Sequence, residues 1–186
     1  MDLDQLFSKF PSLETSRLYL REILDSDLDA IFSIFSNIKV TEFYGIDPLK
    51  SRADGEKTLR SCIDRFPNRK GIRWGLALKQ SGQLIGTIGL QKFNEQSCRA
   101  EIGFDLIPEF WRKGFMSEAL QTVVDFGLSE IRIHRIEAFC EPKNVASMEM
   151  LKRAGFQQEG LLKGYFRWSD GFHDATILAR LNGTPR

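Results

Sequence analysis

A segment between residues 108 and 120 has the residue types of a phosphate-binding loop. It reads PEFWRKGFMSEAL, and its one glycine, Gly114, stands just before a predicted helix. Glycine permits a tight backbone path where a Cβ would block a ligand. Amides at the start of a helix have no helical partners and lie at the positive end of its dipole, which suits a diphosphate. The predicted donors are the amides of Arg112, Lys113, Gly114, Phe115, Met116 and Ser117, with positive charge from the first two side chains.

The same segment also fits an ordinary turn between a strand and a helix. A single glycine is weak evidence, and Gly114 is not followed by the Lys and Ser or Thr of a Walker A motif. No G-x-G-x-x-G fingerprint is present either. A diphosphate bound here would therefore belong to neither a P-loop nucleotide nor a Rossmann-type dinucleotide.

The loop needs a strand before it and a helix after it. Residues 100–107 alternate, with Ile102, Phe104 and Leu106 on one face, and residues 116–128 have apolar side chains at helical spacing. Further strands are predicted at residues 17–23, 74–78, 84–90, 135–140, 161–168 and 175–181, and further helices after residue 27, at 51–66 and at 145–154. This order predicts an α/β fold, with one mixed, mostly antiparallel twisted sheet and helices on both faces.

Length and composition predict one soluble domain over residues 1–186. There are 26 basic and 25 acidic residues, so no charge excess favours nucleic acid or an anionic membrane. No run approaches the roughly 18 apolar residues of a membrane span, and no signal-peptide pattern is present. We therefore expect a cytoplasmic protein. The cysteines (Cys62, Cys98, Cys140) and histidines (His134, His173) form no metal-binding pattern, so we expect reduced thiols and no metal.

Three segments together resemble a known family. Residues 100–119 read AEIGFDLIPEFWRKGFMSEA, residues 15–21 read TSRLYLR, and residues 144–156 read NVASMEMLKRAGF. In order and spacing they resemble the GNAT superfamily of acetyltransferases, and most of all its RimJ/RimL branch, which acetylates N-terminal amines of ribosomal proteins. With the closing hairpin around Asp170 and Gly171, the resemblance covers nearly the whole chain.

The resemblance implies a single-domain GNAT fold whose splayed strand pair forms a cleft for acetyl-CoA. Backbone groups of Phe104, Asp105 and Leu106 would pair with the pantetheine arm as an added strand does. Asn144 would hydrogen-bond the arm, and Ser147 would donate a proton to the departing thiolate. Asn and Ser also suit the N-terminus of a helix, so capping is the alternative role for both.

The sequence departs from the family pattern in the loop and at one carboxylate. Many members have Gly where Arg112 stands and Gly or Ala where Met116 stands. A carboxylate that serves as general base in some RimL-like enzymes aligns with Phe166. Glu101 is the replacement candidate. Alternation places it opposite Ile102, Phe104 and Leu106, and the resemblance puts its strand at the centre of the cleft, where the family often has a carboxylate. A solvated or salt-bridged strand glutamate would look the same.

Other side chains near the expected cleft have weaker assignments. Tyr44 and Tyr165 are candidates for the lining of the acceptor pocket, and both are equally compatible with ordinary packing. Cys140 precedes Asn144 by four residues, so it would lie near the thioester. Direct transfer requires no nucleophilic thiol, and we expect Cys140 to be a bystander.

The resemblance implies direct transfer of acetyl from acetyl-CoA to a primary amine, and we expect the N-terminal α-amine of a protein, ribosomal proteins included. A free α-amine, with a pKa near 7.7–8.0, is about a tenth to a quarter neutral at pH 7.2, against roughly 0.1% or less for lysine. Two alternatives stay open: a small-amine acetyltransferase acting on a polyamine, amino acid or antibiotic, and a CoA-binding regulatory protein without catalysis. The resemblance also suggests a homodimer.

Overall fold

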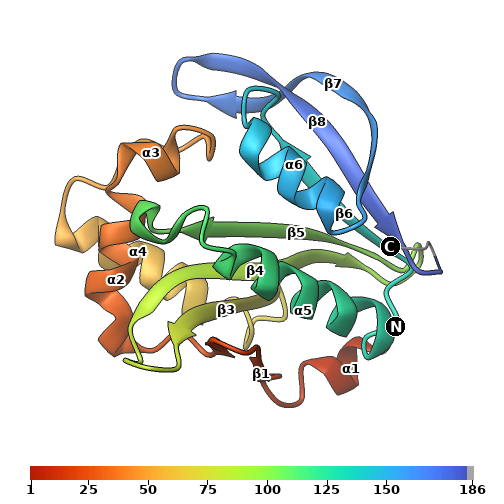
Figure 1. Cartoon of the computed structure of the whole chain (residues 1–186), viewed down its shortest axis with the longest axis horizontal. Coiled ribbons are helices and arrows are strands. Elements are labelled where there is room, and N and C mark those ends of the chain that lie inside the picture. The colour runs from red at the N-terminus through yellow and green to blue at the C-terminus, as the bar shows by residue number, and fades with distance from the viewer. Residues whose placement is uncertain (184–186) are drawn as a thin grey trace.

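The computed structural model describes residues 1–183, which form one eight-stranded sheet with helices packed on it (Figure 1). The strands are β1 (Leu13–Glu14), β2 (Leu18–Arg21), β3 (Gly71–Leu78), β4 (Leu84–Asn94), β5 (Arg99–Leu106), β6 (Arg135–Cys140), β7 (Gln157–Trp168) and β8 (Gly171–Leu181). Their order in space is β1-β2-β3-β4-β5-β6-β8-β7. Among these described strands only β5 and β6 pair in parallel, and the connection between them contains a helix.

Helices cover both faces of this sheet. They are α1 (Leu3–Leu6), α2 (Leu28–Phe35), α3 (Ile38–Thr41), α4 (Arg52–Ile63), α5 (Phe115–Ser129) and α6 (Val145–Arg153). On one face, Trp74 of β3 packs edge-on against Phe126 of α5, which crosses in front of the sheet (Figure 1). The next residue, Gly75, faces the other way, where a Cβ would meet Leu84 and Ile23 of the buried cluster beneath α2 and α4. The central strand β3 is therefore buried on both sides.

The sheet splits between β5 and β6. These strands pair only from Arg99 to Glu101 on β5 and from Arg135 to Glu137 on β6. Beyond that point β5 pairs with β4 alone and β6 with β8 alone. Figure 1 shows the two strands meeting near the C-terminal end of the chain and opening toward α3. The splayed strand pair predicted from the family resemblance is confirmed.

A cluster of ion pairs holds the two strands together where they still pair. Glu137 is buried and accepts hydrogen bonds from Arg99 at 2.7 Å and from Arg135 at 2.6 Å. Arg135 also bonds Glu159 of β7 through both terminal nitrogens. Because these charges link β5, β6 and β7, they fix the apex of the opening.

The predicted α/β architecture and every predicted major element are present. The shortest elements, α1, β1 and α3, were not predicted, because two to four residues show no periodicity. The helix expected after residue 27 begins at Leu28, behind a 3-10 turn over Asp25–Asp27. Asp27 does not cap α2: its carboxylate instead accepts hydrogen bonds from Arg21 and from the Leu24 amide.

Candidate active site

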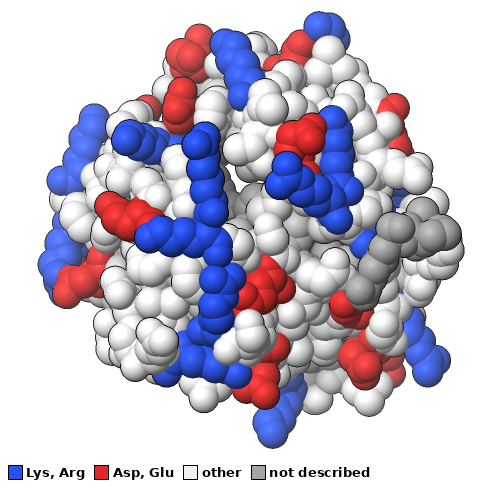
Figure 2. Space-filling model, viewed as in Figure 1, with Lys and Arg blue, Asp and Glu red and all other residues white. Residues whose placement is uncertain are grey.

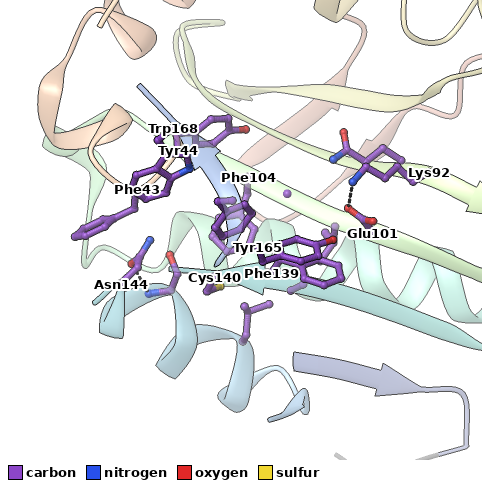
Figure 3. Close-up of a pocket in the computed structure, with 17 residues that line it drawn as sticks. Phe43, Tyr44, Lys92, Glu101, Phe104, Phe139, Cys140, Asn144, Tyr165 and Trp168 are labelled. Carbon is purple, nitrogen blue, oxygen red and sulfur yellow. Dashed lines mark hydrogen bonds and ion pairs between the residues drawn. The ribbon is translucent and has the colours of Figure 1, made fainter. Parts of the chain in front are cut away.

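A cavity of about 250 Å³ lies where β5 and β6 separate (Figure 3). Residues of β4, β5, β6, α6 and β7, together with the loop after α3, form its walls. They are Phe43, Tyr44, Gln91, Lys92, Glu101, Ile102, Gly103, Phe104, Ala138, Phe139, Cys140, Asn144, Ser147, Leu151, Tyr165, Phe166 and Trp168. The cavity therefore brings together Glu101, Phe104, Asn144 and Ser147, which the sequence assigned to one site.

The loop before α5 presents a row of free amides. Gly114 occupies the N-cap position of α5 in the left-handed conformation, with φ 81°, and Arg112 also has a positive φ of 59°. No described residue accepts a hydrogen bond from the backbone N–H groups of residues 112–117. The amides of Phe115, Met116 and Ser117 are first-turn donors of a helix of 15 residues. The predicted geometry for binding an anion is thus present at this loop.

Arg17, the residue just before β2, holds this loop in place. Its Nη1 donates to the Lys113 carbonyl at 3.0 Å and its Nε to Glu118 at 2.8 Å. The guanidinium also lies over the Phe115 ring, 4.1 Å from the centroid. A Cβ on Gly114 would come within 3.3 Å of the Arg17 side chain, so the loop and the arginine fit closely.

Glu118 holds Arg17 in turn, and we call this pair of residues the brace of the loop. Burial alone would raise the pKa of its carboxyl group. Hydrogen bonds from Thr15, from the amide and guanidinium of Arg17 and from Ser16 outweigh that effect and hold the pKa of Glu118 at about 2. Glu118 is therefore ionised at any physiological pH. Figure 2 shows Lys and Arg side chains gathered on the face that carries this loop, which suits an anionic ligand.

The three residues predicted to bind the pantetheine arm lie at the open end of β5, and each has different surroundings. Phe104 lines the cavity. The Leu106 carbonyl already accepts a hydrogen bond from Trp111 Nε1 at 2.7 Å. Asp105 turns its side chain into the opposite face of the sheet, where it is buried. All three lie beyond the last residue of β5 that pairs with β6.

The Asp105 carboxylate belongs to a buried polar network behind the cavity. It forms an ion pair with Arg73 and accepts a hydrogen bond from the Thr87 hydroxyl at 2.9 Å. Arg73 also donates to the Tyr44 hydroxyl at 2.8 Å. This network ties the loop that carries Tyr44 to β3, β4 and β5, and so holds one wall of the cavity in place.

Asn144 and Ser147 lie at the N-terminus of α6, beside the cavity. Asn144 Oδ1 accepts a hydrogen bond from the Ser147 backbone amide at 3.1 Å, so Asn144 does cap the helix. Both residues also line the cavity. Among the described residues, the Ser147 hydroxyl has no hydrogen-bond partner, and it is free to act on a ligand. Capping and a role in the site are therefore compatible.

Glu101 is both ion-paired and exposed to the cavity. Its Oε2 lies 3.0 Å from Lys92 Nζ, and its side chain is 13% exposed. Lys92 sits in an irregular stretch of β4 with a positive φ of 51°, where the register to β5 shifts. Both side chains line the cavity, and no other charged residue in the described chain does so. In Figure 3 this pair occupies the opposite end of the cavity from Asn144 and Phe43.

Cys140 is a buried thiol in the cavity wall. Burial raises its pKa to about 12, so it carries its proton at neutral pH and is a poor nucleophile. Among residues 1–183, no cluster of three or more His, Cys, Asp or Glu side chains could hold a metal ion. No helix in that same range is long and apolar enough to cross a membrane.

Aromatic side chains form much of the cavity lining, and only some of these residues were predicted from the sequence. Tyr44 and Tyr165 were predicted, whereas Phe43, Phe139 and Trp168 were not. Three aromatics in four positions of β7, at residues 165, 166 and 168, are a signal that could have been used. Phe139 could not be found this way, because only the pairing of distant strands brings it next to Tyr165.

The fold of the described residues recurs in solved acetyltransferase structures. RimL, a ribosomal L7/L12 α-N-protein acetyltransferase solved with coenzyme A, superposes with a TM-score of 0.80 at 21% identity, over 92% of this chain and 98% of RimL. Spermidine N-acetyltransferase from Vibrio cholerae, solved with CoA and spermine, gives 0.77 at 23% identity, over 90% and 96%. These structures show that the fold is the same.

The sequence profile of the acetyltransferase (GNAT) domain matches residues 17–157. The uncharacterized N-acetyltransferase YoaA of Bacillus subtilis is 40% identical over 170 residues, which cover 91% of this chain and 96% of YoaA. The chain belongs to the GNAT acetyltransferase family. It is an acetyl-CoA-dependent N-acetyltransferase, with an amine as acceptor.

Proposed function

We propose that this chain is a cytoplasmic, RimJ/RimL-like enzyme that acetylates the N-terminal α-amine of a protein, such as a ribosomal protein. The observation that carries the proposal is the Lys92–Glu101 ion pair. Glu101 is the one carboxylate among the described residues of the cavity lining, and an ammonium group holds it. This one carboxylate, already held by an ammonium group, has to remove a proton only from the charged fraction of the acceptor. An α-amine is already partly neutral near pH 7, whereas a lysine is almost wholly charged, so the site suits the α-amine better.

Acetyl-CoA would bind with its diphosphate on the amides of residues 112–117. The fit rests on the free amides of this loop, on the dipole of α5 and on the side chains of Arg112 and Lys113. Gly114 keeps the backbone open to the ligand. The unpaired edge of β5 around Phe104 would bond the amides of the pantetheine arm, and the Asn144 side-chain amide would donate to it.

The thioester would supply the acetyl group, and side chains of this protein would accept and donate the protons that the transfer requires. The amine nitrogen forms a bond to the carbonyl carbon as the carbon–sulfur bond breaks. Glu101 accepts a proton from the amine, directly or through water, and the Ser147 hydroxyl donates one to the departing sulfur. Backbone amides of the open β5 edge stabilise the negative charge on the carbonyl oxygen. Holding amine and thioester together supplies much of the remaining acceleration.

The proposal is tested by comparing protein N-termini in cells with and without the gene. Mass spectrometry of N-terminal peptides should find a defined set that is acetylated only when the gene is present, and restoring the gene should restore it. If no N-terminus changes while acetylated lysines or acetylated small amines disappear, the α-amine is the wrong acceptor.

A further inference from the structure

The acceptor side of the cavity is walled by aromatic rings from three separate segments. Phe43 and Tyr44 come from the loop after α3, Phe139 from β6, and Tyr165, Phe166 and Trp168 from β7. Phe139 and Tyr165 stack with ring centroids 4.9 Å apart and an angle of 6° between planes. Phe166 stacks on Trp168 at 6.0 Å. Figure 3 shows the Phe139–Tyr165 pair between the Lys92–Glu101 ion pair and the loop that carries Phe43.

These rings are held in position by contacts outside the cavity. Trp168 stacks on His173, with centroids 3.9 Å apart, and His173 is hydrogen-bonded to Asp170. A Cβ on Gly45 would overlap the Trp168 ring, so the loop after α3 lies directly against β7. Tyr44 is fixed from behind by Arg73. Rigid aromatic walls bind an apolar group at low entropic cost, because little has to be ordered on binding.

The charges of the cavity do not suit an acceptor with several cationic groups. Among the described lining residues only Lys92 and Glu101 are charged, and they neutralise each other at 3.0 Å. A polyamine carries one or more ammonium groups besides the reacting amine, and each needs a carboxylate or water when it is buried. Apart from Glu101, which already pairs with Lys92, no described residue of the lining offers a carboxylate.

The acceptor shares the cavity with the thioester, because Asn144 and Ser147 line it too, and only a small acceptor group fits in the space that is left. The cavity volume of about 250 Å³ lies below the roughly 300–1,000 Å³ typical of pockets for drug-sized ligands. A single amino-acid side chain beside the reacting amine is of this scale. The remainder of a polypeptide would have to lie outside the cavity, whose lining residue Tyr165 is 44% exposed.

From these walls, charges and dimensions we infer that the cavity reads the first side chain of the acceptor, and that this side chain is aromatic or large and apolar, such as Phe, Leu or Met. The inference rests on the proposed acetylation of α-amines and adds a specificity to it. The rings of Tyr165 and Trp168 are the specificity-determining groups. Both lie on β7 and line the cavity.

The test is a set of short peptides that are identical after the first residue, which is Phe, Leu, Met, Ala or Ser. With saturating acetyl-CoA, kcat/KM should be at least about tenfold higher for Phe, Leu and Met than for Ala and Ser, as expected for apolar groups that fill a matching pocket. Spermidine should also be at least about tenfold poorer than the Phe peptide. Equal rates, or a preference for Ser, Ala or spermidine, would overturn the inference.

Variants locate the preference in the cavity. Tyr165→Ser and Trp168→Ser should bring the Phe-to-Ser ratio of kcat/KM close to one while the protein still binds CoA. Phe172→Ser is the matched control, because Phe172 lies on the adjoining strand β8, is 72% exposed and does not line the cavity. Its ratio should match that of the parent. A ratio that is unchanged in both cavity variants would show that another surface reads the first residue.

Equilibrium binding separates this inference from the proposed function. Calorimetric titration of the same peptides into CoA-saturated protein measures recognition without chemistry. If no peptide is acetylated but the Phe peptide binds at least about tenfold more tightly than the Ser peptide, the proposed reaction fails and the specificity stands. If all peptides bind equally, the specificity is wrong whether or not acetyl transfer occurs.

Discussion

In the proposed reaction Glu101 and Ser147 act on different protons. Glu101 lies beside Lys92 at one end of the cavity, and Ser147 lies at the start of α6 beside Asn144 (Figure 3). Base and acid are thus separate groups, so the two steps can be impaired independently. Each residue therefore has its own kinetic test.

Glu101→Gln keeps the shape of the side chain and removes the base. The rate at neutral pH should fall by a factor of about 10² to 10⁴, the usual contribution of general-base catalysis. It should recover partly at higher pH, where more of the amine arrives neutral. Steady-state rates from pH 6.5 to 9.5 measure this. Lys92→Met, which removes the ion pair but keeps the carboxylate, should retain more of the rate. A loss of equal size at every pH would mean that Glu101 positions the acceptor instead.

Ser147→Ala should lower kcat much more than it weakens acetyl-CoA binding, because the hydroxyl acts on the departing sulfur. The helix cap survives this change, since Asn144 bonds the backbone amide of Ser147 and not its hydroxyl. Thermal unfolding should therefore match the parent closely, whereas Asn144→Ala should cost about 1 kcal/mol of stability. An unchanged kcat in Ser147→Ala would remove the residue from the chemistry.

At the scale of elements, the conformation of the loop at residues 112–117 depends on contacts with the segment just before β2. Arg17, which directly precedes β2, and Glu118, in the first turn of α5, are about a hundred positions apart in sequence yet clamp the loop between them. Their pairing connects the stability of the fold to the geometry of the anion site.

Glu118→Gln should lower stability at pH 7 by roughly 1.5–3 kcal/mol, the cost of losing hydrogen bonds to a charged group. The folded-state pKa of Glu118 is lowered from 4.5 to about 2. Its contribution is thus fully present above pH 4.5 and is lost as the pH falls toward 2. Melting curves should separate parent and variant at pH 7 and bring them together near pH 2. Glu149→Gln, which breaks an exposed pair with Lys152, should have little effect at either pH. A difference in melting temperature between parent and Glu118→Gln that is the same at both pH values would show that the charge of Glu118 does not stabilise the loop.

The elements around the site were predictable where the signal is local. The strand, Gly114 and helix of the anion loop are consecutive in the sequence, and so are Asn144, Ser147 and the end of α6. The network of Arg73, Asp105 and Tyr44 was not predictable. These residues come from β3, β5 and the loop after α3, which only the tertiary fold brings together. The position of Lys92 beside Glu101 likewise depends on an irregularity in β4 that alternation does not reveal.

At the scale of the whole molecule, the split sheet is the feature that links fold to function. Eight strands share one sheet, yet two separate buried clusters stabilise it, and the opening lies between strands that are clamped at one end only. If a ligand bound in the opening contacts both parts, as proposed above, it should stabilise the folded state as a whole.

CoA should therefore raise the melting temperature. At a hundred times its Kd the gain is about 2.7 kcal/mol, or roughly 5–10 °C for a chain of this size. Gly114→Asp should abolish most of the shift, since it adds bulk and negative charge beside the diphosphate. Gly82→Asp is the matched control: Gly82 also has a positive φ, at 72°, but sits in an open turn. A normal shift in folded Gly114→Asp protein would show that the loop does not bind the diphosphate.

The acceptor nitrogen is tested most directly on a peptide that offers both kinds of amine. The protein is incubated with acetyl-CoA and a short peptide that has a free α-amine and one internal lysine. Tandem mass spectrometry then locates the acetyl group. We expect the α-nitrogen to carry nearly all of the product near pH 7, with the rate falling in Glu101→Gln. Product on the lysine nitrogen, or on neither amine while spermidine is acetylated, would contradict α-amine acetylation at this site.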